Sequence, residues 1–376
     1  MKCINKTEYY SLKIGGLPKG CKQCVQGRKT VLFITGICGM NCFYCPISDK
    51  KNQKDVTYAN EWEVSSIKDL FKEIELCGSK GVGITGGDPL VKLSRTCSWI
   101  KQLKKRFGDK FHVHLYTPLL LVNEKSLKKL HSAGLDEIRF HPDVMDNKHW
   151  SRLELAKKFK WDVGVEIPVV PGWEKETKKL IDYLDGKIKF LNLNELEIAD
   201  SNANKLVDKG FMPKDSISYA VKDSEKLAKR LLKYCLKKKF RVHYCTCKLK
   251  DKVQLSKRIQ LRAKGVAKKY DVVQEDGTLL RGVVYLDELM PGFDYEKRLV
   301  KADQKEVLSD LGRLRRKIMS RFEVPSELME VDKDRLRILV APWVLEEISK
   351  ELIFKCALVQ EYPTQDHMIV ELEWLN

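Results

Sequence analysis

The sequence lacks any long apolar run. No stretch of its 376 residues is long and apolar enough to cross a bilayer, and the N-terminal segment MKCINKTEYYSLKIGG has no apolar core of the kind that a signal peptide needs. No internal repeat is visible either. These absences argue against an integral membrane protein and a secreted protein, and they predict a cytoplasmic location.

A disulfide framework is also not expected. Twelve cysteines in a reducing compartment are more often metal ligands or core residues than partners in disulfides. Five of them stand alone in the sequence and are predicted to be structural or inert, namely Cys3, Cys77, Cys97, Cys235 and Cys356.

Positive charge is plentiful but unevenly distributed. The formal net charge is +18, and the segment from Lys222 to Lys269 holds 18 Lys or Arg against three acidic residues, a net charge of +15. The other 328 residues therefore carry only +3. Such a block is usually a solvated helical face, but its density also favours a polyanionic partner.

Short β-branched runs alternate with longer amphipathic runs that end at glycine, as in VSSIKDLFKEIELCG, SLKKLHSAG and KETKKLIDYLDG. Repeated βα units predict an α/β fold with a parallel sheet, and six units favour an open or partial (βα)6 barrel. Ligands are then expected at the carboxyl ends of the strands. The predicted strands are residues 29–36, 81–86, 111–117, 136–140, 162–170 and 190–198.

Four segments are predicted along the chain. Residues 1–28 form an N-terminal segment with a cysteine pair, and residues 29–200 form the partial barrel. Residues 201–270 complete the barrel and add the basic helical segment with a second cysteine pair. Residues 271–376 contain a hairpin that turns at Asp276-Gly277 and a small α+β domain.

The loop GICGMNCFYCPIS gathers three cysteines, Cys38, Cys42 and Cys45, just after the first predicted strand. Three thiolates on one loop can hold three irons of a [4Fe–4S] cluster and leave the fourth iron open to another ligand. A structural zinc site is the alternative, but zinc sites usually combine two Cys-x2-Cys halves.

This loop resembles the cluster loop of the radical S-adenosylmethionine (SAM) superfamily, which also places an aromatic residue, here Tyr44, before the last cysteine. The segment GITGGDPL resembles that family's Gly-Gly-Glu-Pro segment, with Gly86, Gly87 and Asp88, where Asp replaces the usual Glu. EIPVVPGW (166–173) is similar to a strand of pyruvate formate-lyase activating enzymes. The resemblance covers roughly residues 29 to 200.

The resemblance implies a radical SAM fold and two cofactors, a [4Fe–4S] cluster and SAM. It implies that one electron cleaves SAM to methionine and a 5′-deoxyadenosyl radical, which abstracts a hydrogen atom from a substrate. An electron donor such as ferredoxin or flavodoxin is implied as a partner. Tyr44 is expected near the adenine, and Gly86, Gly87 and Asp88 near the methionyl group.

Polar residues at strand ends are further candidates. They could bind ribose, the methionine carboxylate or substrate, or they could only satisfy hydrogen bonds within the sheet. Glu166 is counted among the cofactor-binding residues on this basis. The set comprises His112, His114, Tyr116, His141, Glu166, Asn192, Asn194, Glu195 and Glu197.

Two cysteine pairs suggest an auxiliary metal site. Cys21 and Cys24 precede the first strand, and Cys245 and Cys247 follow the last helical unit, with His243 as a reserve ligand. Four such ligands suit a second iron–sulfur cluster or zinc, and core thiols are the alternative.

RNA modification by a radical SAM enzyme, an oxidoreductase, is the leading functional hypothesis. The basic segment is predicted to form two helices joined through HYCTC that dock RNA beside the radical site. The alternatives are an activase that installs a radical on a protein partner, an enzyme acting on an anionic lipid, and a nucleic-acid-binding protein whose metal sites are structural. The sequence predicts neither the product nor the oligomeric state.

Overall fold

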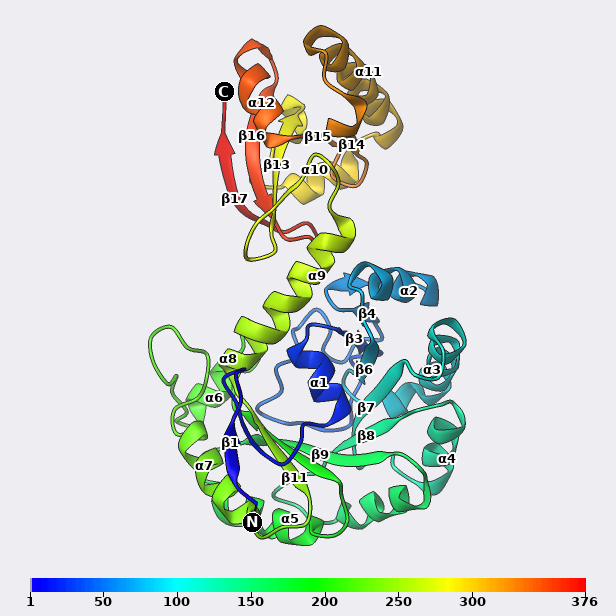
Figure 1. The fold of residues 1–376 in the computed structure, drawn as a ribbon, viewed down its shortest axis with the longest axis vertical. Coiled ribbons are helices and arrows are strands. Elements are labelled where there is room, and N and C mark those ends of the chain that lie inside the picture. The colour runs from blue at the N-terminus through cyan, green and yellow to red at the C-terminus, as the bar shows by residue number, and fades with distance from the viewer. Residues whose placement is uncertain (1) are drawn as a thin grey trace. The chain divides into compact units, whose positions relative to one another are not determined.

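The computed structural model describes residues 2–376, which divide into two compact units with the boundary between Arg258 and Ile259 (Figure 1). The boundary lies within helix α9 (Ser256–Val266). None of the helices in residues 2–376 combines the length and apolarity that a bilayer crossing requires.

The first unit is built on a sheet in which seven adjacent strands are parallel to one another, in the order β11-β10-β9-β8-β7-β6-β3. Six of these strands confirm the six predicted from the sequence. The strands are β3 (Lys29–Phe33), β6 (Gly81–Thr85), β7 (His112–Pro118), β8 (Glu137–His141), β9 (Asp162–Val169), β10 (Phe190–Glu195) and β11 (Arg241–Cys245).

Strand β11 corrects one prediction. Its residues were expected to link two basic helices, but they form the seventh parallel strand beside β10. Val242, His243 and Tyr244 are all buried. A strand covered on both faces shows no alternation of polar and apolar residues, and basic residues on either side of this short segment obscured it.

The sheet stays open, as a partial barrel requires. Strands β3 and β11 do not pair with each other, and short antiparallel strands extend both edges. The extensions are β1 (Ile4–Lys6) and β2 (Leu12–Ile14) beside β11, and β4 (Tyr58–Ala59) and β5 (Trp62–Glu63) beside β3.

Helices follow the parallel strands and lie along the outer side of the curved sheet (Figure 1). They are α2 (Ile67–Leu76), α3 (Leu93–Phe107), α4 (Glu124–Ser132), α5 (Glu174–Leu184), α6 (Ala203–Asp208) and α7 (Ser224–Cys235). A capping box of Ser66 and Asp69 begins α2, because each side chain accepts a hydrogen bond from the other residue's backbone N–H. The apolar faces of α2 and α7 complete the core, with Leu70, Ile74 and Leu231 fully buried.

Helix α1 (Lys19–Val25) has a different place. It lies inside the curve of the sheet rather than outside it (Figure 1). A Cβ built on Gly20 would come within 2.6 Å of Nη2 of Arg139 and 2.8 Å of the His114 ring, so only glycine permits this approach. Helix α1 therefore closes the end of the barrel interior at which the parallel strands begin.

The second unit is an antiparallel sheet with helices, as the α+β prediction required. The predicted hairpin is confirmed, because β12 pairs with β13 and Gly277 takes a φ of +88° in the turn. The sheet order is β14-β15-β13-β16-β17. Its strands are β12 (Val272–Val273), β13 (Leu279–Tyr285), β14 (Met329–Asp332), β15 (Arg337–Val340), β16 (Lys355–Glu361) and β17 (Ile369–Trp374). The helices are α10 (Tyr295–Lys301), α11 (Gln304–Phe322) and α12 (Pro342–Ile348).

Candidate active site

A cavity of about 580 Å³ runs through the interior of the partial barrel. Cys42 and Cys45 line it beyond the carboxyl end of β3, and Lys29 lines it at the opposite end of the same strand. The cavity therefore extends from the cysteine loop at the carboxyl ends of the strands down to the region of α1. This is the position in which parallel α/β folds bind their ligands.

The three cysteines of the predicted cluster loop are suited to an iron–sulfur cluster. Cys38, Cys42 and Cys45 are partly exposed, and their thiols are not engaged in disulfides. Within residues 2–376 no three His, Cys, Asp or Glu side chains are placed to hold a single metal ion. In a [4Fe–4S] cluster each thiolate binds a different iron, so these ligands need not converge on one point. The donor set fits such a cluster, and the ligand assignment stays a prediction.

Gly86 and Gly87 line the cavity and pack tightly against the cysteine loop. The N–H of Gly87 donates to the carbonyl of Thr35 at 2.8 Å, and a Cβ at Gly87 would come within 2.5 Å of the carbonyl oxygen of Ile37. Gly86 has a φ of +150°. These glycines therefore allow two loops to approach each other, in addition to the predicted approach to SAM, which stays a prediction.

Asp88 is fully buried beside these glycines and has a structural task. One of its carboxylate oxygens accepts hydrogen bonds from the backbone N–H of Leu90 at 3.0 Å and from the hydroxyl of Thr117 at 2.8 Å. Asp88 thereby caps the short helical turn that starts at Pro89. A contact between Asp88 and the methionyl group remains a prediction.

Tyr44 lines the cavity and is oriented by His141. The His141 ring contacts the backbone carbonyl of Glu166 through Nδ1 at 2.8 Å, and its Nε2 is 3.1 Å from the Tyr44 hydroxyl. Because a carbonyl can only accept, Nδ1 carries the proton and Nε2 accepts from tyrosine. Burial lowers the pKa of His141 and so favours the neutral ring.

Glu166 anchors a polar network on the wall of the cavity. Its carboxylate accepts from Arg139 at 2.9 Å, from Asn192 at 2.8 Å and from Asn194 at 3.0 Å. Burial raises the pKa of Glu166, but the Arg139 guanidinium and the two amides outweigh burial and lower the pKa to about 2. Glu166 is therefore an anion held in one orientation.

Arg139 and Lys29 also line the cavity, although neither was predicted from the sequence. Arg139 also pairs with Glu137 at 2.6 Å, and its Nη1 donates a hydrogen bond to the Tyr116 hydroxyl at 3.0 Å. The available signal was the pattern of β8, in which Glu137, Arg139 and His141 alternate with apolar residues. In a parallel strand buried on both faces, such a polar row must point into the interior.

The predicted auxiliary ligands are only partly brought together. Cys21 and Cys245 lie in one small apolar cluster, and the Asn192 amide is 3.3 Å from the Cys21 sulfur. Cys24 is also buried, with its side chain within hydrogen-bonding reach of Lys29. Cys247 begins helix α8 (Cys247–Leu249), and its N–H donates to Glu195 at 2.9 Å.

His243, the reserve ligand, is buried, and its Nε2 lies 3.2 Å from the Ser11 hydroxyl. The same hydrogen bond would orient a core histidine that binds no metal. The auxiliary site therefore stays a prediction, with core thiols as its alternative.

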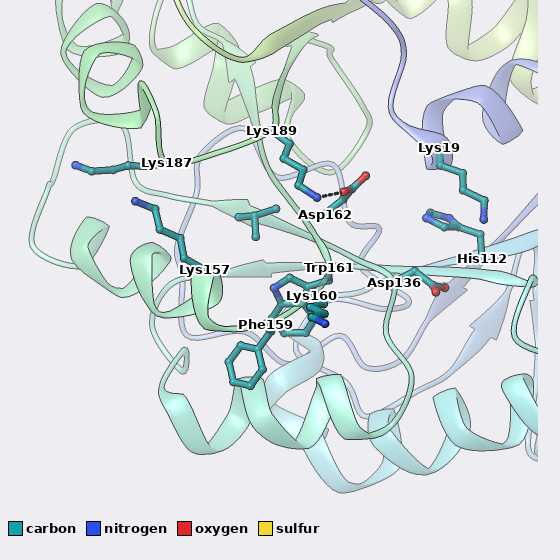
Figure 2. A pocket seen from close by; sticks show the side chains of 11 residues that line it. Lys19, His112, Asp136, Lys157, Phe159, Lys160, Trp161, Asp162, Lys187 and Lys189 are labelled. Carbon is teal, nitrogen blue, oxygen red and sulfur yellow. Dashed lines mark hydrogen bonds and ion pairs between the residues drawn. The ribbon is translucent and has the colours of Figure 1, made fainter.

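A second pocket, of about 640 Å³, lies at the opposite end of the barrel (Figure 2). Loops that precede β8, β9 and β10 supply Asp136, Lys160 and Lys189, and α1 supplies Lys19. Figure 2 shows the ion pair between Lys189 and Asp162, whose atoms are 2.5 Å apart. Because the cysteine loop leaves the carboxyl end of β3, this pocket is not where the cluster loop meets the barrel.

The basic segment 222–269 does not form one continuous helical surface. Helix α7 and helix α9 are separated by strand β11, by α8 and by a π-helical turn at Lys250–Leu255. Several of its basic side chains form ion pairs with carboxylates, namely Lys226, Lys229, Arg230, Lys238, Lys250 and Arg258. The positive charge available to a polyanion is therefore smaller than the sequence count suggests.

Comparison with known proteins matches residues 32–184 to the radical SAM superfamily. Residues 277–373 match a domain of unknown function, DUF8061. The chain is 42% identical over 380 residues to a "Putative glycyl-radical enzyme activating enzyme" of Methanocaldococcus jannaschii, covering 97% of this chain and 94% of that protein. The chain therefore belongs to the radical SAM superfamily and is an enzyme that uses a [4Fe–4S] cluster and SAM.

More distant relatives share part of the chain. A GTP 3′,8-cyclase of Vibrio vulnificus is 26% identical over 44% of this chain and 47% of its own length. Among solved structures, methylornithine synthase has a TM-score of 0.39 at 14% identity, covering 55% of this chain and 65% of that chain. The tryptophan-binding methyltransferase TsrM of Kitasatospora setae has a TM-score of 0.35 at 13% identity, covering 49% of this chain and 40% of that chain.

Proposed function

We propose that this radical SAM enzyme installs a radical on a protein partner, and that the partner is a glycyl-radical enzyme. The observation that carries the proposal is the 42% identity to the relative from Methanocaldococcus jannaschii, which spans both units of the chain. This favours the activase alternative over RNA modification, the leading hypothesis from the sequence.

Cys38, Cys42 and Cys45 would hold the cluster at the mouth of the cavity. When bound, the reduced cluster supplies the electron that cleaves SAM and leaves a 5′-deoxyadenosyl radical to take a hydrogen atom from the substrate. A ferredoxin or flavodoxin is the proposed source of that electron. The backbone around Gly86 and Gly87 would approach the methionyl group, and Tyr44 would pack against the adenine.

The chain's own residues prepare the space below the cluster loop. His141 fixes the Tyr44 hydroxyl, and Arg139 fixes the Glu166 carboxylate. Helix α1 closes the base, so a substrate group in the cavity would be shielded from water and from stray hydrogen donors. An extended segment of a partner protein would enter from the end that carries the cluster loop.

The cluster assignment is tested by replacing Cys42 with alanine. We expect Cys42→Ala to abolish 5′-deoxyadenosine formation after anaerobic reconstitution with iron and sulfide, because a [4Fe–4S] cluster with two protein ligands is not held in place. The matched control is Cys97→Ala, which changes an isolated, partly exposed cysteine on α3. Normal 5′-deoxyadenosine production by Cys42→Ala would disprove the assignment.

The nature of the partner is tested by electron paramagnetic resonance. The reconstituted enzyme, with SAM and reductant, should generate a glycyl radical signal on a glycyl-radical enzyme from the same organism. Unmodified partner protein, together with a new modification in RNA or lipid from cells that carry the gene but not from a deletion strain, would reject the activase proposal. Failure to form 5′-deoxyadenosine at all would favour a binding protein with structural metal sites.

RNA remains the second candidate because of the exposed lysines near the end of α7. Lys233, Lys237 and Lys239 are exposed. They precede β11, however, and so lie at the end of the barrel opposite the cluster loop. RNA held there would not lie beside the radical site as predicted.

A further inference from the structure

Lys29 is a partly buried cation at the base of the cavity. It is the first residue of β3, lines the cavity, and is in register with Gly81 of β6, while its side chain reaches Gly83. A Cβ built on Gly83 would be 3.4 Å from Cδ of Lys29 and 2.8 Å from Nε2 of His114. A side chain at Gly83 would therefore clash with the His114 ring, whereas it would only touch the lysine stem.

The other charged groups of the cavity already have partners. Arg139 pairs with Glu137 and Glu166, and Lys250 pairs with Glu197 at 2.6 Å. Glu195 also accepts a hydrogen bond from the backbone N–H of Cys247.

Lys29 differs from these groups. Among residues 2–376, no Asp or Glu carboxylate lies within ion-pair distance of its ammonium group. Its neighbours are the Tyr116 ring, whose centre is 5.8 Å from Nζ, and the Cys24 side chain. Burial lowers the pKa of Lys29, but Cys24 and Tyr116 outweigh it and raise the pKa, so the amine stays protonated. The ammonium group acts on Glu166 through space and helps to lower the pKa of that carboxyl, yet with no carboxylate of the described part of the chain in direct contact it can still pair with a bound anion.

The position of Lys29 separates it from the SAM site. Residues 29 and 33 mark the two ends of β3, and a strand rises about 3.3 Å per residue, so the lysine backbone lies about 13 Å below the end of the strand. The cluster loop begins beyond that upper end. Lys29 is therefore placed to contact a group deeper in the cavity than the cosubstrate.

The charge identifies the class of that group. One ammonium balances one negative charge, which matches a carboxylate, whereas a phosphate monoester carries about −1.5 to −2 at neutral pH. The Glu166 carboxylate, which already interacts with Lys29 through space, repels each negative charge of a ligand and so disfavours a phosphate more than a carboxylate. The Tyr116 hydroxyl, which contacts Arg139, belongs to the same wall.

We infer that Lys29 forms a substrate-recognition subsite for a single carboxylate, carried by the partner segment that enters the cavity. This inference rests on the proposed function, because it takes the cavity as the place where the partner's hydrogen atom is removed. The carboxylate would come from an Asp or Glu side chain or from a chain terminus. Its ion pair with Lys29 would fix how deeply the partner segment enters the cavity.

The test uses reconstituted holoenzyme with SAM and three short glycine-rich peptides. The first contains one Asp and is acetylated and amidated, the second has Asn in its place, and the third has no Asp but a free C-terminus. We expect wild type to bind the Asp peptide or the free-C-terminus peptide about tenfold more tightly than the Asn peptide, as for a charge-assisted hydrogen bond in a desolvated site. The stronger of these two identifies the source of the carboxylate.

Lys29→Met should remove this preference, and Lys226→Met, which changes an exposed lysine of α7, should retain it. Equal binding of all three peptides by wild type would overturn the inference without any variant, as would a preference retained in Lys29→Met. A Lys29→Met protein that fails to fold is replaced by Lys29→Gln in the same measurement. Absence of a glycyl radical on the partner, with the peptide preference intact, would reject the proposed partner and not the subsite.

Discussion

At the scale of single residues, Glu166 is a carboxylate that its neighbours inside the barrel keep ionised. Its pKa in the folded protein, about 2, lies below the value of about 4.3 expected in the unfolded chain. The ionised carboxylate therefore stabilises the fold fully above about pH 4.3, and this stabilisation is lost as the pH falls toward 2.

Replacement of the Glu166 carboxylate should show this dependence of stability on pH. We expect Glu166→Gln to lower the free energy of unfolding of the metal-free protein by about 3 kcal/mol at pH 7, because the buried Arg139 loses one of its two carboxylate partners. The difference from wild type should shrink between pH 4.3 and pH 2. Urea denaturation at several pH values measures it. Glu174→Gln, which breaks partly exposed ion pairs of α5, should cost no more than about 1 kcal/mol. An undiminished difference at pH 2 would contradict the assigned ionisation.

At the scale of structural elements, the turn after β6 sets the position of the cysteine loop. A Cβ at Gly87 would lie 2.5 Å from the Ile37 carbonyl oxygen and 2.6 Å from that of Gly36, and both are backbone atoms that cannot rotate away. The sequence places Gly87 near the methionyl group of SAM, where a side chain is expected to weaken SAM binding. The structure shows that it must also displace the loop that carries Cys38.

We therefore expect Gly87→Ala to reduce both iron incorporation and SAM affinity, the latter by at least tenfold. Iron analysis after reconstitution and equilibrium binding of SAM measure the two effects. Gly16→Ala is the matched control, because a Cβ there meets no atom within 4 Å. If Gly87→Ala retained full iron content and bound SAM as wild type does, neither the loop contact nor the cosubstrate contact would be important.

At the scale of the whole molecule, the two ends of the partial barrel differ in chemistry. The carboxyl ends of the strands carry the cysteine loop and the glycines, and the amino ends carry lysines such as Lys160, Lys189 and Lys237. Long-range electrostatic attraction can bring an anionic partner to the lysine-rich end, but the proposed cluster ligands lie at the other end, where a substrate would have to approach closely.

Reversal of charge at the lysine-rich end should separate these two roles. We expect the combined change of Lys233, Lys237 and Lys239 to Glu to leave 5′-deoxyadenosine formation within about twofold of wild type. Any RNA affinity should fall, and its dependence on salt should weaken, since each lost phosphate contact reduces the slope of log affinity against log salt by about 0.7 on single strands. Loss of SAM cleavage in this variant would contradict the separation of the two ends.

Much of the fold could be predicted from local sequence. Amphipathic periodicity and terminal glycines predicted helices α2, α4 and α5. Short apolar runs predicted six of the parallel strands. The hairpin at Gly277 followed from its Asp-Gly turn. Strand β11 was missed because a strand buried on both faces has no period, and its neighbouring lysines dominated the pattern.

The sequence by itself determined the chemistry of the site, because Cys38, Cys42 and Cys45 are close along the chain and their spacing is a local property. Only the tertiary structure decided which distant residues share the cavity. Lys29, Arg139 and Glu166 come from strands β3, β8 and β9, and they meet because curvature of the sheet turns one face of each strand inward. Net charge along the chain likewise did not reveal which lysines are paired, since an ion pair depends on neighbours that folding supplies.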